Sequence, residues 1–319
     1  MLTPFFDNLI DDFGIWQHSD GEKVIAEEGY ALDDAARGLI VCLALKKTVQ
    51  AEALYRYIIN SQFKNGFYGF ATSEHKYIKY PASEDATGQV IWAMGYASSV
   101  GFHENEARAV VHQLSSRIIE FRHIRGYAYA LLGSIYIDKK MAKVLAVKLI
   151  SLFNGTEKEW FWPESVITYG NGIIPYALLR YALVARDSKA ADIGLTILEF
   201  LHSICQSSRL LGPIGNEGWL SKQDKTVPTF SQQPIDSAYM IWAWLAAYEH
   251  FSSEEYYRHA HEWMAWFNGI NPLRAAVYDN RTLKAYDGID KKEVNYHSGA
   301  EANICLLLSL YMLKNRTTL

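Results

Sequence analysis

The stretch EGYALDDAARGLIVCLALKKT, from Glu28 to Thr48, decides the fold. Between Asp34 and Lys46, apolar side chains cover nearly every face of a 3.6-residue helix, which is typical of a helix buried on all sides. A few residues later an amphipathic segment with a charged face runs from Gln50 to Gln62. The two patterns predict a buried helix joined by a short turn to an outer helix.

The same alternation repeats along the chain, and sustained period-2 alternation is almost absent. Further segments apolar on nearly all faces are Thr87 to Ser99, Gly126 to Ile137, Gly172 to Arg186, Asp236 to Glu249 and Ala300 to Lys314. Amphipathic segments precede each buried one: the N-terminus up to Asp12, Gln50 to Gln62, Asn105 to Arg122, Lys139 to Phe153, Lys189 to Cys205 and Glu254 to Phe267. Helical hairpins must stack to hide their apolar faces, so the pattern predicts an all-α (α/α)6 barrel, a toroid of six hairpins forming one domain over residues 1–319.

The predicted connections are asymmetric in length. A buried helix leads to the next outer helix within a few residues, whereas five of the six opposite connections run about 15 to 30 residues. Long loops in a compact domain are usually functional, so we expect the site on the rim that they share. These loops are rich in glycine and aromatic residues, and aromatic planes suit the C–H faces of sugars.

Composition excludes several other classes. The 319 residues include 31 basic and 35 acidic side chains without a basic run, which predicts neither a nucleic-acid nor a membrane partner. No basic region precedes Asp12, and no stretch approaches the roughly 18 apolar residues of a membrane span, so we expect a cytoplasmic protein. Cys42, Cys205 and Cys305 are far apart and are expected to be buried free thiols.

Acidic residues recur near the starts of the predicted buried helices. Asp34, Asp85, Asp236 and Glu301 form a candidate catalytic pool, from which one carboxylic acid would protonate a leaving oxygen and another would act as base or nucleophile. The competing interpretation is that these acids cap helix N-termini.

Polar and aromatic residues accompany these acids, which capping alone does not predict. The candidate substrate-binding residues are Trp160, Trp162, Tyr169, Asn171, Gln232, Gln233, Asp287, Asn295 and His297. His259 and His261 lie two apart on an outer helix and are expected at the surface, and no zinc, calcium, nucleotide or serine-esterase motif is present. The sequence therefore predicts neither a metal nor a cofactor.

Six motifs together resemble a known group of domains: EGYALDDAARGLIVCLAL, SEDATGQVIWAMG, WFWPESVITYGNGIIPYALL, GNEGWL, QQPIDSAYMIWAWLAAYE and YDGID with NYHSGAEANICLLLSL. The chain resembles (α/α)6-barrel domains of the six-hairpin glycosidase type, in particular the bacterial group often found beside glycosyltransferases. This resemblance implies a carbohydrate substrate and a possible glycosyltransferase partner. Gln89 stands where the resemblance implies an arginine, whereas Asp236 supplies the expected acid.

The leading functional prediction is a glycoside hydrolase that cleaves an oligosaccharide or polysaccharide by two-carboxylate chemistry. One alternative is a carbohydrate-binding or accessory domain of a glycosyltransferase system. Another is a sugar epimerase or isomerase, whose proton transfer would use His123 and His297. The sequence offers no recognisable partner histidine for either of them.

Overall fold

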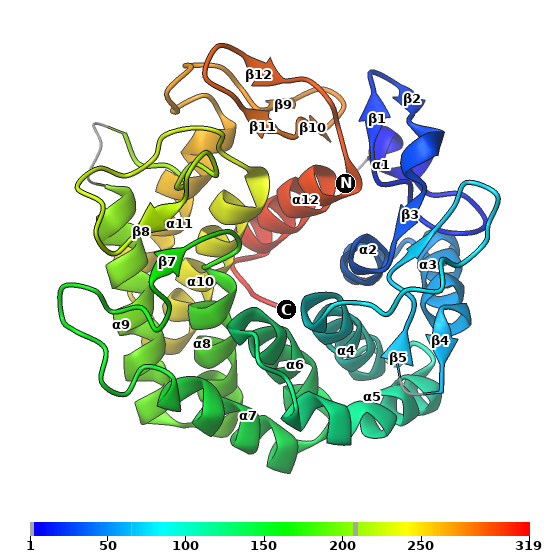
Figure 1. The fold of residues 1–319 in the computed structure, drawn as a ribbon, viewed down its shortest axis with the longest axis horizontal. Coiled ribbons are helices and arrows are strands. Elements are labelled where there is room, and N and C mark those ends of the chain that lie inside the picture. The colour runs from blue at the N-terminus through cyan, green and yellow to red at the C-terminus, as the bar shows by residue number, and fades with distance from the viewer. Residues whose placement is uncertain (1–2, 65, 207–209) are drawn as a thin grey trace. The chain divides into compact units, whose positions relative to one another are not determined.

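The computed structural model of the chain describes residues 3–64, 66–206 and 210–319. Within them the chain forms twelve α-helices (Figure 1): α1 Pro4–Asn8, α2 Leu32–Ala44, α3 Thr48–Asn60, α4 Glu84–Ser99, α5 Glu104–Ile119, α6 Ile124–Ile137, α7 Lys139–Ser151, α8 Ile173–Ala185, α9 Ser188–Cys205, α10 Pro234–Phe251, α11 Glu254–Phe267 and α12 Ala300–Asn315. None of the described helices is long and apolar enough to cross a membrane.

The predicted helices are confirmed with one exception. The six buried segments correspond to α2, α4, α6, α8, α10 and α12, and five outer segments correspond to α3, α5, α7, α9 and α11. The first outer helix is shorter than predicted, since α1 ends at Asn8 rather than near Asp12. Asp11 Oδ1 accepts the backbone N–H groups of Phe13 and Gly14 at 2.8 and 2.9 Å, and this turn replaces helical bonding. The three cysteines are buried and free, as predicted.

In the described parts of the loops the chain forms a short 3-10 helix, Ala26–Glu28, and strands of two residues each: β1 Ser19–Asp20, β2 Lys23–Val24, β3 Tyr30–Ala31, β4 Gln62–Phe63, β5 Gly66–Phe67, β6 Phe70–Ala71, β7 Val166–Ile167, β8 Leu220–Ser221, β9 Tyr278–Asp279, β10 Lys284–Ala285, β11 Gly288–Ile289 and β12 Val294–Asn295. They pair two at a time, for example β3 with β6 and β7 with β8, both antiparallel. The predicted asymmetry of loop length is confirmed, with the short exception at residues 120–123 between α5 and α6.

The chain groups into two compact units. Unit 1 comprises residues 1–145, 280–284 and 297–304, and unit 2 comprises residues 146–279, 285–296 and 305–319. Helices α7 and α12 therefore contribute residues to both units. The single domain predicted over residues 1–319 stays a prediction.

In unit 1, the buried helices α4 and α6 approach each other closely at two glycines. A Cβ added to Gly133 of α6 would lie 2.0 Å from the Ile91 carbonyl oxygen of α4, and one added to Gly95 would lie 2.4 Å from the Gly133 carbonyl oxygen. Because neither glycine has a side chain, the two backbones can pack directly against each other. Helix α2 packs against both α3 and α4.

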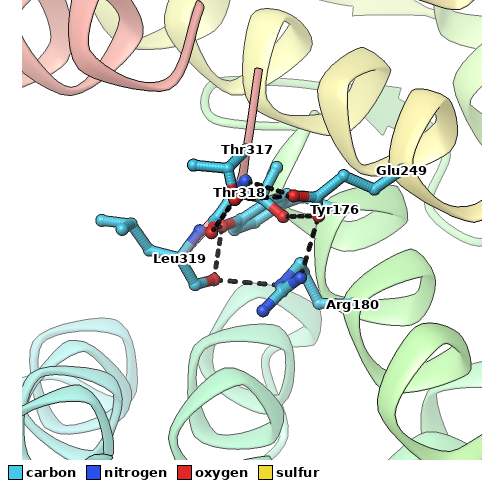
Figure 2. Close-up of polar contacts among 6 residues, drawn as sticks. All are labelled: Tyr176, Arg180, Glu249, Thr317, Thr318 and Leu319. Atoms are coloured by element: carbon cyan, nitrogen blue, oxygen red, sulfur yellow. Dashed lines mark hydrogen bonds and ion pairs between the residues drawn. The ribbon is translucent and has the colours of Figure 1, made fainter. Parts of the chain in front are cut away.

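In unit 2, α8 packs against α9 and α10, and α10 packs against α11. Residues 317–319 are bound to α8 and α10 (Figure 2). Arg180 Nε donates to the Leu319 carbonyl oxygen at 3.0 Å, and Arg180 Nη1 donates to Glu249 Oε2 at 3.0 Å. Glu249 Oε1 also accepts the backbone N–H of Thr318 at 2.8 Å, so one buried ion pair fixes this segment.

Candidate functional site

An acidic cluster in unit 1 joins the first turn of α2 to the first turn of α12. Arg37 Nη2 donates to Asp34 Oδ1 at 3.0 Å, and Arg37 Nη1 donates to Glu301 Oε2 at 2.9 Å. Asp33 Oδ2 lies 3.5 Å from Arg37 Nη2. Because Arg37 follows Asp33 and Asp34 by one helical turn, its guanidinium reaches them and a carboxylate 264 residues away. We name these four residues the α2–α12 cluster.

The carboxylates of the α2–α12 cluster differ in their surroundings. The side chain of Asp34 is only 10% exposed, whereas that of Glu301 is 39% exposed. Burial raises the pKa of Asp34 well above its usual range, and the charge of Asp33 raises it further, while Arg37 and His18 oppose this shift. Asp34 therefore keeps its proton to a higher pH than an ordinary aspartate, whereas solvent and ligands can reach the carboxylates of Glu301 and Asp33.

The exposed His18 adjoins this cluster, and its segment is bonded to the segment that carries the exposed His297. The positive charge of His18 lies close enough to Asp34 to lower its pKa. Ser19 Oγ donates to the Ser298 carbonyl oxygen at 2.7 Å, and Ser298 N donates to the Ser19 carbonyl oxygen at 3.0 Å. These bonds hold the segment that carries His18 beside the segment that carries His297, and both histidine side chains are exposed.

The start of α4 holds two more acids of unit 1. Glu84 Oε2 accepts the backbone N–H groups of Arg122 and His123, each at 2.8 Å, and so ties α4 to the loop before α6. Asp85 is half-buried in the first turn. One turn later, Gln89 is 4% exposed, and its buried Oε1 has no hydrogen-bond partner among the described residues. A catalytic role for Asp85 stays a prediction.

Asp236 lies in unit 2, at the start of α10. Its Oδ1 accepts the backbone N–H of Gly170 at 2.6 Å, a residue with a φ of +59°. Asn171 Nδ2 donates to the Thr168 carbonyl oxygen at 2.7 Å in the same turn. Asp236 and Asn171 line a cavity of only about 20 Å³, which is smaller than a sugar ring. Asp236 therefore holds the turn before α8, and its predicted catalytic role remains untested.

Gln232 also has structural partners. Its Oε1 accepts the Trp266 indole N–H at 2.7 Å, and its Nε2 donates to the Pro213 carbonyl oxygen at 2.8 Å. Its backbone pairs with Ile289 in both directions. Gln233, Asp287 and Asn295 are half-buried in the loops of unit 2, and Tyr169 is exposed there. Their predicted sugar contacts stay predictions.

Trp160 and Trp162 lie together at a cavity of about 320 Å³ in unit 2. Trp160 Nε1 donates to the Glu164 carbonyl oxygen at 2.9 Å, which fixes its ring. Trp162 is 2% exposed, and its Nε1 has no hydrogen-bond partner among the described residues. The two rings therefore form the walls of a recess rather than an open stacking surface.

A second histidine group lies between α9 and α11. His202, His259 and Glu262 could each offer a metal-ligand atom, and these atoms lie within 4.8 Å of one another. The ring nitrogens are already bonded, however, because Trp263 Nε1 donates to His202 Nδ1 at 3.1 Å and His259 Nδ1 lies 2.7 Å from Glu262 Oε2. Gln206 Nε2 also lies 2.8 Å from His202 Nε2, so both ring nitrogens of His202 already have partners and this donor set does not fit a metal. His259 is half-buried rather than at the surface as expected.

Sequence reasoning missed Arg37 and His18. Arg37 had a usable signal, because an arginine three and four residues after two aspartates on one helix is placed to bind both. His18 had none, since its loop carries no periodic pattern and its neighbour Ser298 is 279 residues from Ser19.

No protein-family model and no curated protein matches the sequence. A sugar epimerase from a ruminal bacterium has a TM-score of 0.74 at 14% identity, over 96% of this chain and 95% of that one. Cellobiose 2-epimerase from Bacillus thermoamylovorans has a TM-score of 0.73 at 14% identity, over 97% and 95%. A C. cellulolyticum cellulase solved with cellobiose has a TM-score of 0.61 at 12% identity, over 95% and 88%. The chain has the (α/α)6-barrel fold of these proteins, as its sequence predicts.

Proposed function

We propose that the protein is a carbohydrate-active enzyme that epimerises or isomerises a reducing sugar at the α2–α12 cluster. One observation carries this choice: the exposed pair His18 and His297 is held on adjoining segments beside the cluster. The sequence alone offered His297 no partner. Imidazoles have pKa values near neutrality and suit both halves of a proton transfer.

The reaction needs a base and an acid. One histidine removes the proton from C2 of the open-chain aldose, and the electron pair forms a C1–C2 double bond as the other histidine protonates O1. Returning a proton to the opposite face of C2, with O1 deprotonated, gives the epimer. Returning it to C1, with O2 deprotonated, gives the ketose. No proton is gained or lost overall.

The remaining members of the cluster position the substrate. Glu301 is a carboxylate that a ligand can reach, and it is suited to accept hydrogen bonds from sugar hydroxyl groups. Arg37, 1% exposed, fixes the Glu301 carboxylate, and the buried Asp34 fixes Arg37 from the other side. Asp34 is too enclosed to touch a sugar itself.

Hydrolysis is the second candidate. Asp34 and Glu301 are two carboxyl groups in contrasting surroundings on one guanidinium, and pKa values pushed apart are typical of an acid and base pair. A cellulase among the similar structures favours this reading. The position of Arg37 argues against hydrolysis, because its guanidinium binds both carboxyl groups and neither is free to act on a glycosidic bond. A glycosyltransferase partner has no support in the structure and stays a prediction.

Proton NMR in D2O separates the two reactions. The protein would be incubated with glucose, mannose and cellobiose, without and with inorganic phosphate. We expect the substrate signals to convert to an epimer that carries deuterium at C2 or to a ketose that carries deuterium at C1, with the glycosidic bond of cellobiose intact. Shortened sugars without deuterium at C2 would establish hydrolysis instead, and phosphate-dependent sugar phosphates would establish phosphorolysis.

Variants assign the site. His18→Asn and His297→Asn should each lower turnover by roughly 10²-fold or more, the usual contribution of an acid or base. His261→Asn, an exposed histidine on α11 in unit 2, is the matched control and should keep wild-type turnover. Retained activity in both His18 and His297 variants would contradict the proposal.

A further inference from the structure

We propose that the cavity beside Trp160 and Trp162 is a second carbohydrate site, which binds one neutral pyranose residue without converting it. The cavity lies wholly in unit 2, whereas the α2–α12 cluster belongs to unit 1. The proposal stands on the shape and chemistry of this cavity and does not depend on the reaction assigned above.

The size of the cavity fits a sugar. Its volume of about 320 Å³ lies at the lower end of small-molecule sites, which run from about 300 to 1,000 Å³. One hexose ring fills such a space, whereas the cavity beside Asp236, at about 20 Å³, holds little more than a water molecule.

The parts of the wall at Trp160 and Lys222 are fixed before any ligand arrives. Trp160 N donates to the Glu157 carbonyl oxygen at 3.1 Å, and Trp160 Nε1 donates to that of Glu164 at 2.9 Å. Lys222 N donates to the Ser165 carbonyl oxygen at 2.9 Å, where β7 and β8 pair. A preformed recess loses little freedom on binding, which favours a small polar ligand.

The lining offers both donors and acceptors. Lys222 Nζ lies 2.8 Å from Glu157 Oε1, so the ion pair presents a cation and a carboxylate side by side. Glu164 lines the same recess. Hydroxyl groups both donate and accept, so a polyol can bond to this mixed wall, and its C–H faces can contact the Trp160 edge. The Lys222–Glu157 pair leaves no unbalanced positive charge to attract an anion.

The indole N–H of Trp162 is a further observation, independent of the volume of the cavity and of its charged lining. It lines the recess, is 2% exposed, and has a buried Nε1 without a partner among the described residues. Most buried donors in proteins are paired, so an unpaired indole N–H at a cavity needs an explanation. Nε1 is closed to solvent, so a sugar hydroxyl oxygen in the cavity would accept this hydrogen bond after a small turn of the Trp162 ring, which no hydrogen bond to the described residues holds in place.

The test uses a sugar that the proposed enzyme cannot convert. Methyl α-D-glucoside has no free aldehyde, so it cannot enter proton transfer at C2. It would be titrated into protein carrying ¹⁵N-labelled tryptophan while the indole N–H signals are followed, with calorimetry in parallel. We expect the Trp162 signal to shift saturably in the millimolar range.

Three variants control the result. Trp162→Phe and Lys222→Met should each weaken binding by roughly tenfold, the loss of about one good hydrogen bond. Lys222 is 40% exposed, so its substitution tests the site even if Trp162→Phe fails to fold. Trp244→Phe is the matched control and should bind normally, since Trp244 also has an unpaired buried Nε1 but lies away from this cavity.

Three outcomes would overturn the proposal of a second carbohydrate site. A Trp162 signal that stays fixed up to about 100 mM glucoside, or binding that survives Lys222→Met and Trp162→Phe unchanged, removes the site. Saturable shifts with putrescine but not with the glucoside would make it a cation site. If no sugar is converted in D2O but the Trp162 shift persists, the enzymatic proposal fails and this one stands.

Discussion

At the scale of single residues, Arg37 decides what the acids near α2 and α12 can do. Its guanidinium is buried, and it binds Asp34 and Glu301 through different terminal nitrogens. One carboxyl group is enclosed, and burial raises its pKa, while the other is held at the surface. Sequence reasoning placed both acids at helix starts, yet their division of roles depends on burial, which no local pattern encodes.

His202 gives a prediction about pH and stability. Burial lowers the pKa of His202 to about 4 from 6.5, and the neighbouring His259 adds to this effect. Between pH 6.5 and pH 4, His202 is therefore protonated in the unfolded chain but neutral in the folded protein. The contribution of neutral His202 to the free energy of unfolding is fully present above pH 6.5 and falls as the pH drops toward 4. The loss amounts to about 3 kcal/mol at pH 4.

Urea unfolding of His202→Gln at pH 7 and pH 4.5 checks this expectation. Glutamine can still accept the Trp263 indole N–H, so the variant should keep the packing but lose that part of the pH slope. His261→Gln on α11 should retain the wild-type slope. Identical slopes in the wild type and His202→Gln would show that another group causes the acid sensitivity.

At the scale of elements, the sequence predicts the helices well because the spacing of apolar residues indicates which faces of each helix are buried. Helices apolar on all faces, such as α6 and α10, can only be buried, and five outer helices match their predicted ranges closely. The predicted first helix was too long, because the pattern assigned Asp11 to the polar face of a helix. In the structure the Asp11 side chain instead accepts hydrogen bonds from the backbone of Phe13 and Gly14. Such local competition is invisible to periodicity.

The contact between α4 and α6 yields the second prediction. A Cβ on Gly133 would meet the Ile91 carbonyl oxygen at 2.0 Å and cannot be accommodated unless the helices separate. Gly133→Ala should therefore lower the free energy of unfolding by about 3 kcal/mol or more. Chemical denaturation followed by circular dichroism would measure it.

Gly38→Ala in α2 is the matched control. There the nearest atom to the added Cβ is Leu54 Cδ1 at 3.0 Å, the end of a flexible side chain, and alanine gains about 1 kcal/mol of helix propensity. The two effects offset, so stability should change by less than about 1 kcal/mol. Equal losses at the two glycines would mean that backbone contact does not limit the packing of α4 on α6.

At the scale of the whole molecule, contacts between residues far apart in sequence set the limit of prediction. The pattern yields the barrel because hairpins repeat, but the candidate site rests on pairs such as Arg37 with Glu301 and Ser19 with Ser298, more than 260 residues apart. Each of these residues has other plausible roles locally, as a cap or a loop hydroxyl. These long-range contacts exist only in the folded chain, so the sequence predicted the acidic residues but not the residues that bind them.

The binding of residues 317–319 to unit 2 supplies the last prediction at this scale. Glu249 binds Arg180 and the backbone N–H of Thr318, and both charged side chains are largely buried (Figure 2). Glu249→Ala should cost about 3 to 5 kcal/mol in urea unfolding, because it removes the carboxylate that pairs with the largely buried Arg180 guanidinium and binds the Thr318 backbone. Glu254→Ala removes the exposed 3.2 Å ion pair with Arg316 in the same region and should cost less than about 1 kcal/mol. If both variants lost the same stability, the buried pair would be no more than a surface contact, and the anchoring of this segment would have to come from apolar packing.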